Sequence, residues 1–142
     1  METTEGQALR RVFLPDSITA IGAYAFQECV GLTGNIAIPN GVTIMQYTFG
    51  NCTSLTVAPV IPNSVTDLSY TFEGCTSLTV APVIPYGVTN MHHTFTSTSI
   101  VVAPAIPNSV TDLSGTFTQC SSLITAPVIP SSVTDMQHTF NK

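Results

Sequence analysis

Three histidines and three aspartates carry the side chains of this sequence that are best suited to acid–base or metal chemistry. His92 and His93 are neighbours, and His138 follows His93 after 45 residues. Three of the four aspartates recur at one position of a repeated pattern, as Asp67, Asp112 and Asp135. A general acid and a general base need different environments, whereas equivalent repeat positions give both groups the same one. We therefore expect turn or strand-edge roles for the aspartates and no enzymatic activity.

The four cysteines also recur at one repeated position, as Cys29, Cys52, Cys75 and Cys120. One repeat is a residue shorter between Phe95 and Ile100, and the simplest alignment deletes its cysteine. Side chains at one position of stacked repeats point inward in parallel, so we expect free buried thiols rather than disulfides. Ligands a full repeat apart, with no histidine converging on them, cannot complete a tetrahedral zinc site. The sequence also lacks a glycine-rich phosphate loop and a serine nucleophile motif, and it predicts no metal and no cofactor.

These residues recur because the chain consists of six copies of one sequence repeat. The repeated phenylalanines step by 23, 23, 23, 22 and 23 residues, at Phe26, Phe49, Phe72, Phe95, Phe117 and Phe140. A Leu-Pro or Ile-Pro pair keeps the same period. A period in the low twenties is typical of a solenoid, whose units are stable only when stacked on neighbours. We predict one solenoid domain of about six coils over residues 9–142, ending mid-repeat, with residues 1–8 as an N-terminal extension.

The repeat from Ile61 to Val83 predicts the course of one coil. Its apolar residues fit neither one long helix nor one long strand, so we expect each leg to point one side chain inward. These residues are Ile61, Val65, Leu68, Phe72, Cys75, Leu78, Ala81 and Val83. Residues 65–68 are predicted to form a short parallel strand against their copies, and this leg should carry the sheet. Residues 70–75 are predicted to form one helical turn that places Phe72 in the core.

Prolines shape the remaining leg of each coil. Pro62 and its copies precede residues such as Asn, Gly and Ser, which indicates a turn. Stacking would also place four prolines in one column, at Pro59, Pro82, Pro104 and Pro127. No N–H is available there for a sheet ladder. We expect an extended, polyproline-like leg at residues 57–62, with isolated bridges beside it.

The first repeat, residues 9–29, reads Leu-Arg-Arg-Val-Phe-Leu-Pro, then Ile-Thr-Ala-Ile-Gly-Ala-Tyr-Ala-Phe, then a cysteine at Cys29. It resembles the BspA-type leucine-rich repeat, whose units run Leu-x-x-Ile-x-Ile-Pro, Val-x-x-Ile-Gly-x-x-Ala-Phe and Cys. The resemblance extends from Leu9 to Phe140. It implies an all-β, right-handed leucine-rich repeat solenoid at the cell surface or outside the cell. It also implies a role in adhesion, with host or neighbouring-cell macromolecules as partners.

Composition argues against several other partners. Charged residues make up 8% of the chain, against about 25% in ordinary domains. The net charge is -5 and the three cations are Arg10, Arg11 and Lys142, so no basic patch exists and we predict no nucleic-acid partner. No run approaches the roughly 18 apolar residues of a membrane span. Residues 1–7 lack the basic and then apolar order of a secretory signal.

Positions that differ between repeats are free to form a binding surface. The position two residues before each phenylalanine holds Tyr24, Tyr47, Tyr70, His93, Gly115 and His138. Because rows of exposed aromatic side chains make good contacts, we predict a binding surface at Tyr47, Tyr70, Tyr86, His92 and His93. The alternative, that Tyr47 and Tyr70 only pack on each other, stays open. The leading hypothesis is a non-enzymatic, cell-surface or secreted module for adhesion or protein binding.

The coil ends suggest an alternative function. The last repeat shows no polar cap, and an uncovered coil presents apolar surface and unpaired strand edges. Either the sequence is a fragment of a longer array, or such ends join copies head to tail, a contact that propagates into a fibre. A structural protomer that forms a homo-oligomer through its coil ends is therefore the second hypothesis. A hydrolase formed by loops is the least favoured, because the repeats have almost no insertions between them.

Overall fold

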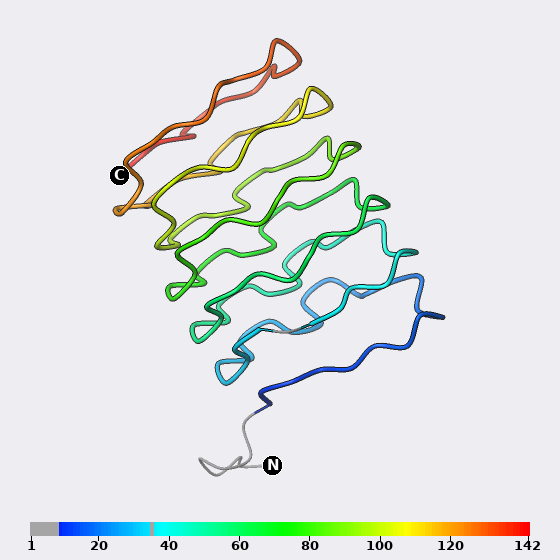
Figure 1. The fold of residues 1–142 in the computed structure, drawn as a ribbon. Helices are drawn as coiled ribbons and strands as arrows, with labels where there is room; N and C mark the ends of the chain where they lie inside the picture. Colours follow the sequence, from blue (N-terminus) through cyan, green and yellow to red (C-terminus); the bar gives the residue numbers. More distant parts are fainter. Residues whose placement is uncertain (1–8, 35) are drawn as a thin grey trace.

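The computed structural model describes residues 9–34 and 36–142. The chain winds into coils that stack one on the next, from the blue N-terminal residues to the red C-terminal ones (Figure 1). The predicted N-terminal extension, residues 1–8, lies outside the described residues. In the described part of the chain, no α-helix forms and the β-structure consists of isolated bridges. The predicted solenoid is confirmed, and it is built from turns and extended segments.

The repeated phenylalanines form one continuous file through the core. From Phe26 to Phe140, neighbouring rings stack with centroids between 5.6 and 6.0 Å apart. The four inner rings are at most 2% exposed, at Phe49, Phe72, Phe95 and Phe117. Buried Leu, Ile, Val and Met side chains pack in the same cluster. This arrangement confirms that like residues of successive coils form inward files.

The segment around each phenylalanine is a run of overlapping turns. Every second N–H donates within the coil to the carbonyl three residues earlier, as at Thr71, Glu73 and Cys75. The N–H groups between them donate to carbonyls of the next coil, as at Tyr70, Phe72 and Gly74. Tyr70 has a φ of 56° and Gly74 a φ of 70°, and a right-handed helix contains neither value. The predicted helical turn is therefore replaced by turns, whereas the inward position of Phe72 is confirmed.

From the coil of Ile44 onward, the predicted strand leg pairs with its copies through one parallel bridge between neighbouring coils. The bridged residues pair in the order Ile44, Asp67, Asn90, Asp112 and Asp135. Oδ1 of Asp67 also accepts the N–H of Ser69 at 2.8 Å, and the other two aspartates repeat this contact. Such Asx turns hold the chain at the bend that follows each bridge. The predicted turn and strand-edge roles of the aspartates are thus confirmed.

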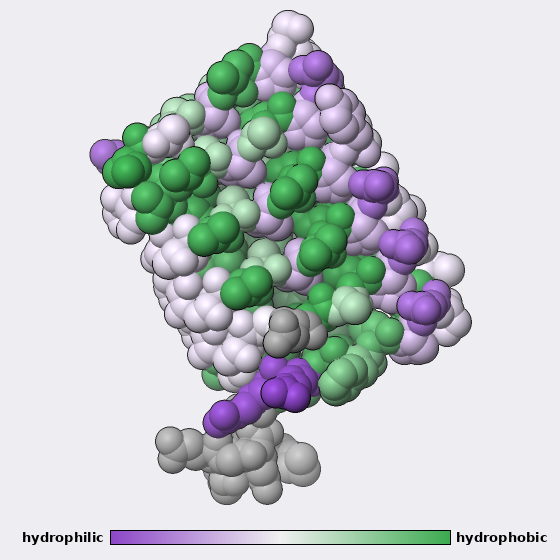
Figure 2. All heavy atoms as spheres, viewed as in Figure 1, coloured by the Kyte–Doolittle hydropathy of each residue, from purple (hydrophilic) through white to green (hydrophobic). Residues whose placement is uncertain are grey.

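The proline leg runs extended across the outside of the stack. Each coil enters a turn at its Leu-Pro or Ile-Pro pair, where for example the Val65 N–H donates to the Pro62 carbonyl at 3.1 Å. Val83 is predicted from the repeat pattern to point inward, and this prediction is wrong, because its side chain is 86% exposed. Ile84 takes the inward position, and in an extended backbone its neighbour then faces out. The face seen in Figure 2 accordingly shows rows of hydrophobic side chains along the stack.

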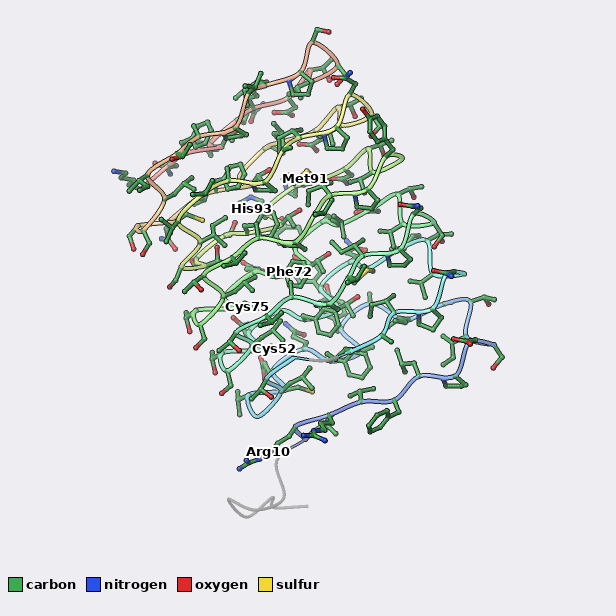
Figure 3. The ribbon with its side chains drawn as sticks, viewed as in Figure 1. Arg10, Cys52, Phe72, Cys75, Met91 and His93 are labelled. Atoms are coloured by element: carbon green, nitrogen blue, oxygen red, sulfur yellow. The ribbon has the colours of Figure 1, made fainter. Side chains whose placement is uncertain are left out.

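The cysteines line the inside of the coils as free thiols, which confirms the expectation. Cys52 and Cys75 lie inside the stack beside Phe72 (Figure 3). Sγ of Cys75 donates to the carbonyl of Phe49 in the preceding coil at 3.1 Å. Burial raises the pKa of Cys52 to about 11 and that of Cys75 to about 12. These thiols therefore stay protonated at neutral pH.

The short repeat keeps its cysteine position, and Thr98 occupies it. Thr98 is 3% exposed, and its Oγ1 lies 3.5 Å from Sγ of Cys120. The predicted deletion of this position is therefore wrong. The missing residue falls between Thr98 and Ile100, because the other coils form an extra turn at this corner, such as the one at Thr76 and Ser77. Alignment by residue type placed the deletion at the cysteine position, because it did not anticipate that a threonine, Thr98, occupies the space of the cysteine.

Candidate binding surfaces

Four aromatic side chains form a second file on the outside of the coils. Tyr24, Tyr47, Tyr70 and His93 stack with ring centroids 4.6, 4.2 and 5.0 Å apart. The file, called here the Tyr–His file, ends where the His93 ring covers Gly115. A Cβ on that glycine would collide with the ring where it now lies, so a larger residue there would displace the His93 ring. The predicted packing of Tyr47 on Tyr70 is therefore present.

Every residue of the Tyr–His file has a left-handed backbone. The φ angles of its four residues lie between 52° and 67°. Gly115, which occupies the same repeat position, has a φ of 63° without a Cβ. Left-handed conformations cost a non-glycine residue about 1–3 kcal/mol, and glycine avoids that cost. The chain thus keeps aromatic side chains where its own backbone favours glycine.

His92 connects the file to the neighbouring coil through hydrogen bonds. Its Nε2 lies 2.9 Å from the Tyr70 hydroxyl. Its Nδ1 bonds to Oγ of Ser114, which in turn donates to Oδ1 of Asp112. The His92 ring also meets the rings of Tyr70 and His93 edge-on, with centroids 5.1 and 4.5 Å apart. The structure therefore brings four of the predicted site residues together, at Tyr47, Tyr70, His92 and His93.

The surroundings of the file change the acidity of its members. Burial, followed by the nearby Tyr70, raises the pKa of Tyr47 to about 12. Burial and the neighbouring His92 lower the pKa of His93, although Asp112 acts in the opposite direction. The tyrosine therefore remains a neutral hydroxyl at physiological pH, and the environment of His93 favours its neutral form. The file offers hydrogen-bonding groups and ring edges rather than charge.

The cluster of Ser114, His92 and Asp112 differs from a catalytic triad. In a triad the imidazole bridges the serine and the carboxylate through its two nitrogens. Here Ser114 bonds to Nδ1, and the nearer oxygen of Asp112 also lies on that side, 3.9 Å away, while Nε2 faces Tyr70. Ser114 is also buried. Across the described residues, no group of three or more His, Cys, Asp or Glu side chains could hold a metal ion.

Tyr86 lies apart from this cluster, on the exposed side of the proline leg. It is 77% exposed and belongs to a set of exposed side chains, called here the proline face: Val57, Val60, Val80, Val83, Tyr86, Val102 and Val128. A groove of about 290 Å³ between two coils is lined by residues that include Pro59, Val60, Pro82 and Val83. Sequence reasoning missed this face because it assigned apolar repeat positions to the core. The prolines on both sides of Val60 and Val83 were the available signal.

Comparison with known families assigns the chain. The BspA type leucine-rich repeat region matches in six copies, over residues 4–124 and 58–141. The chain belongs to this family. Its coils, inward phenylalanine file and cysteine position thus represent the BspA-type repeat, and the resemblance noted in the sequence is confirmed. No curated protein matches the sequence.

Solved structures show the same fold. A leucine-rich repeat protein from Bacteroides ovatus is 27% identical, with a TM-score of 0.68 over 86% of this chain and 34% of that one. A leucine rich cell surface protein from Faecalibacterium prausnitzii is 24% identical, with a TM-score of 0.64 over 85% of this chain and 32% of that one. The leucine-rich repeat protein of T. pallidum is 22% identical, with a TM-score of 0.60 over 87% and 72%. This BspA-type chain spans about a third of the length of the first two proteins.

Members of this family serve as repeat modules for binding or structure, and the chain is consistent with either use. No helix in the described part of the chain is long and apolar enough to cross a membrane.

Proposed function

We propose that this chain is a non-enzymatic adhesion or protein-binding module, displayed at the cell surface or secreted. Membership of the BspA-type family supports a binding role, and the cell-surface protein from Faecalibacterium prausnitzii supports the location. The partner is a protein or another macromolecule of a host or neighbouring cell. Its contact surface is the outer edge of the Tyr–His file together with His92.

The observation that carries this proposal is the stacked row of aromatic side chains at Tyr47, Tyr70 and His93. Left-handed φ angles recur in every coil, also at Glu28, Asn51, Ser97 and Gln119, so the backbone conformation belongs to the repeat and does not by itself call for aromatic side chains. The equivalent glycine at Gly115 shows that a coil forms without an aromatic ring at this position. Retained tyrosines therefore indicate a role beyond folding.

The edge of the file suits a polar partner surface. Tyr47 and Tyr70 are half-buried, so their ring faces are occupied by stacking while part of each side chain reaches solvent. Partly exposed Asp112 adds a hydrogen-bond acceptor beside them, and partly exposed His92 adds ring surface, because both of its nitrogens are already bonded within the chain. Tyrosines supply large contact area at low conformational cost, which is typical of protein-binding surfaces. Tyr86, on the proline face, is also a predicted contact, and its role in binding stays a prediction.

Adhesion assays test the proposal directly. Beads coated with the chain are applied to immobilised extracellular-matrix proteins and to fixed cells. The double variant Tyr47→Asn/Tyr70→Asn keeps residues that tolerate a left-handed backbone but removes the rings, and should weaken capture at least tenfold. The matched control, Thr66→Asn/Thr89→Asn, changes two exposed residues of the bridge leg and should bind normally. Tyr70→Phe keeps the ring in the stack and removes only the hydroxyl that bonds to His92. A loss of capture in this folded variant would therefore be a loss of binding and not of folding.

Two results would overturn this proposal. Unchanged capture by the folded tyrosine double variant would reject the Tyr–His file as the contact surface. A wild-type chain that captures none of the targets would reject adhesion to them.

Head-to-tail assembly through coil ends is the second candidate, and the apolar side chains it would bury include Met136 and Phe140 of the last described coil. Light scattering across a concentration series checks it, because end-to-end contacts produce particles that lengthen without limit. A particle size independent of concentration would contradict fibre assembly.

A further inference from the structure

We propose that the proline face is a contact surface between two copies of this chain, which pair face to face. The proposal does not rest on adhesion, because the proline face and the Tyr–His file use different residues. Of the seven members of the proline face, Val60, Val83 and Val128 are each more than 80% exposed. Monomeric proteins seldom present an apolar patch larger than about 300–600 Å² to water.

The apolar area of the proline face is a large part of what each partner buries in a stable pair of proteins. Burial of one valine side chain removes roughly 60–120 Å² of apolar surface from water. Burial of a tyrosine removes roughly 150–250 Å². Scaled by their exposed fractions, the six valines and Tyr86 therefore offer roughly 400–700 Å² of apolar surface, against about 800 Å² of total surface per partner in a standard interface.

Electrostatic repulsion between two copies does not oppose pairing at the proline face. The chain carries a net charge of -5, so two copies repel each other at most surfaces. None of the residues that line the four grooves of the proline leg is charged. Interface cores are depleted in charged residues in the same way. A second copy can therefore approach here without bringing like charges together.

The regular spacing of the face identifies the occupant as a second copy. Val60 and Val83 form ridges one coil apart, and the groove of about 290 Å³ lies between them. The next groove continues the series and is lined by Val83, Tyr86 and Ala105 among others. A second copy repeats its ridges at the same spacing, so several valines enter several grooves at once. A face that meets itself around a two-fold axis forms a closed dimer.

Sedimentation equilibrium of the purified chain tests the proposal. From low to high micromolar concentration, the mass should rise from 15.0 kDa and level off at 30.0 kDa, twice the mass of one chain. The variant Val60→Asp/Val83→Asp adds two charges to the face, and should weaken the dimer at least a hundredfold. The matched control, Thr66→Asp/Thr89→Asp, adds the same charges to exposed positions of the bridge leg and should dimerise as the wild type does.

Cross-linking provides a readout that does not need a charged variant. Mild oxidation of Val83→Cys should yield a covalent dimer, whereas Thr89→Cys, outside the proline face, should stay monomeric. The native thiols are largely buried and should add little cross-linking of their own. A wild-type chain that remains at 15.0 kDa throughout would overturn the proposal. So would a dimer that survives both aspartates, or a mass that passes 30.0 kDa and keeps rising, which indicates stacking through coil ends.

Discussion

The rings of Phe49 and Phe72 lie 5.8 Å apart, with their planes inclined by only 6°, and neither ring is exposed to solvent. Each ring thus packs against the rings of the preceding and the following coil. The apolar contacts that join coils therefore depend on an unbroken file.

Replacement of Phe72 by alanine should lower the free energy of unfolding by about 3–5 kcal/mol, because a buried ring is removed from the middle of the file. Chemical denaturation followed by circular dichroism measures the change. Ile124→Ala, at an exposed position outside the proline face, is the control and should change stability by less than about 0.5 kcal/mol. A Phe72→Ala variant as stable as wild type would show that the ring contributes nothing to the core.

Gly115→Ala should destabilise the chain by roughly 1–3 kcal/mol. The glycine has a left-handed φ of 63° and lies directly under the His93 ring. Gly22→Ala is the matched control, because an alanine Cβ there would meet no atom within 4 Å beyond its chain neighbours, and the φ of Gly22 is not left-handed. Addition of His93→Asn to the Gly115→Ala variant should restore part of the loss, and thermal unfolding would show it. If the double variant is no more stable than Gly115→Ala, the ring is not the cause.

Stability should decrease as the pH falls through about 6.5, the ordinary pKa of histidine. The folded chain holds the pKa of His93 below that value, so the unfolded chain binds more protons in this window and gains stability relative to the folded one. Melting temperatures at pH 7.5 and pH 5.5 measure the effect. His93→Asn should flatten this dependence, and an equal slope in that variant would assign it to another group.

The cysteines should react slowly with thiol reagents in the native chain at pH 7–8. Burial raises the pKa of Cys75 to about 12 and also raises that of half-buried Cys29, so little thiolate exists. Absorbance of a chromogenic disulfide reagent follows the reaction, with Cys29 expected to react first. In strong denaturant all four should react promptly. Fast labelling of the native protein would contradict the inward cysteine file.

The periodicity of the sequence was sufficient to predict the stack. A phenylalanine at the Phe72 position of all six repeats can pack into one core only if the coils lie in register. The same repeat predicted the bridge position at Asp67 and the turn at Pro62. Conformation within a coil was harder to predict. The left-handed φ of Tyr70 follows from the pattern of bonds to the next coil, and no tyrosine signals such a backbone by its identity.

The repeat pattern also could not predict which side chains of the proline leg point into the core. Val83 and Ile84 are both apolar, and only the extended backbone decides which one faces the core. For the candidate site, sequence brought together Tyr47, Tyr70 and His93 by their shared repeat position. It added Tyr86 as the aromatic residue at another variable position, directly after a proline, and the structure separates Tyr86 from the others.

The bonds that join the coils along the phenylalanine legs also determine how the molecule responds to mechanical load. Hydrogen bonds from Tyr70, Phe72 and Gly74 all run toward the same neighbouring coil, along the direction in which the stack grows. Tension on the two chain termini therefore peels one coil at a time, and each released coil lengthens the chain while the remaining coils stay intact. If the module has the proposed adhesive role, a load on it would be released in steps, one coil at a time, rather than in a single rupture.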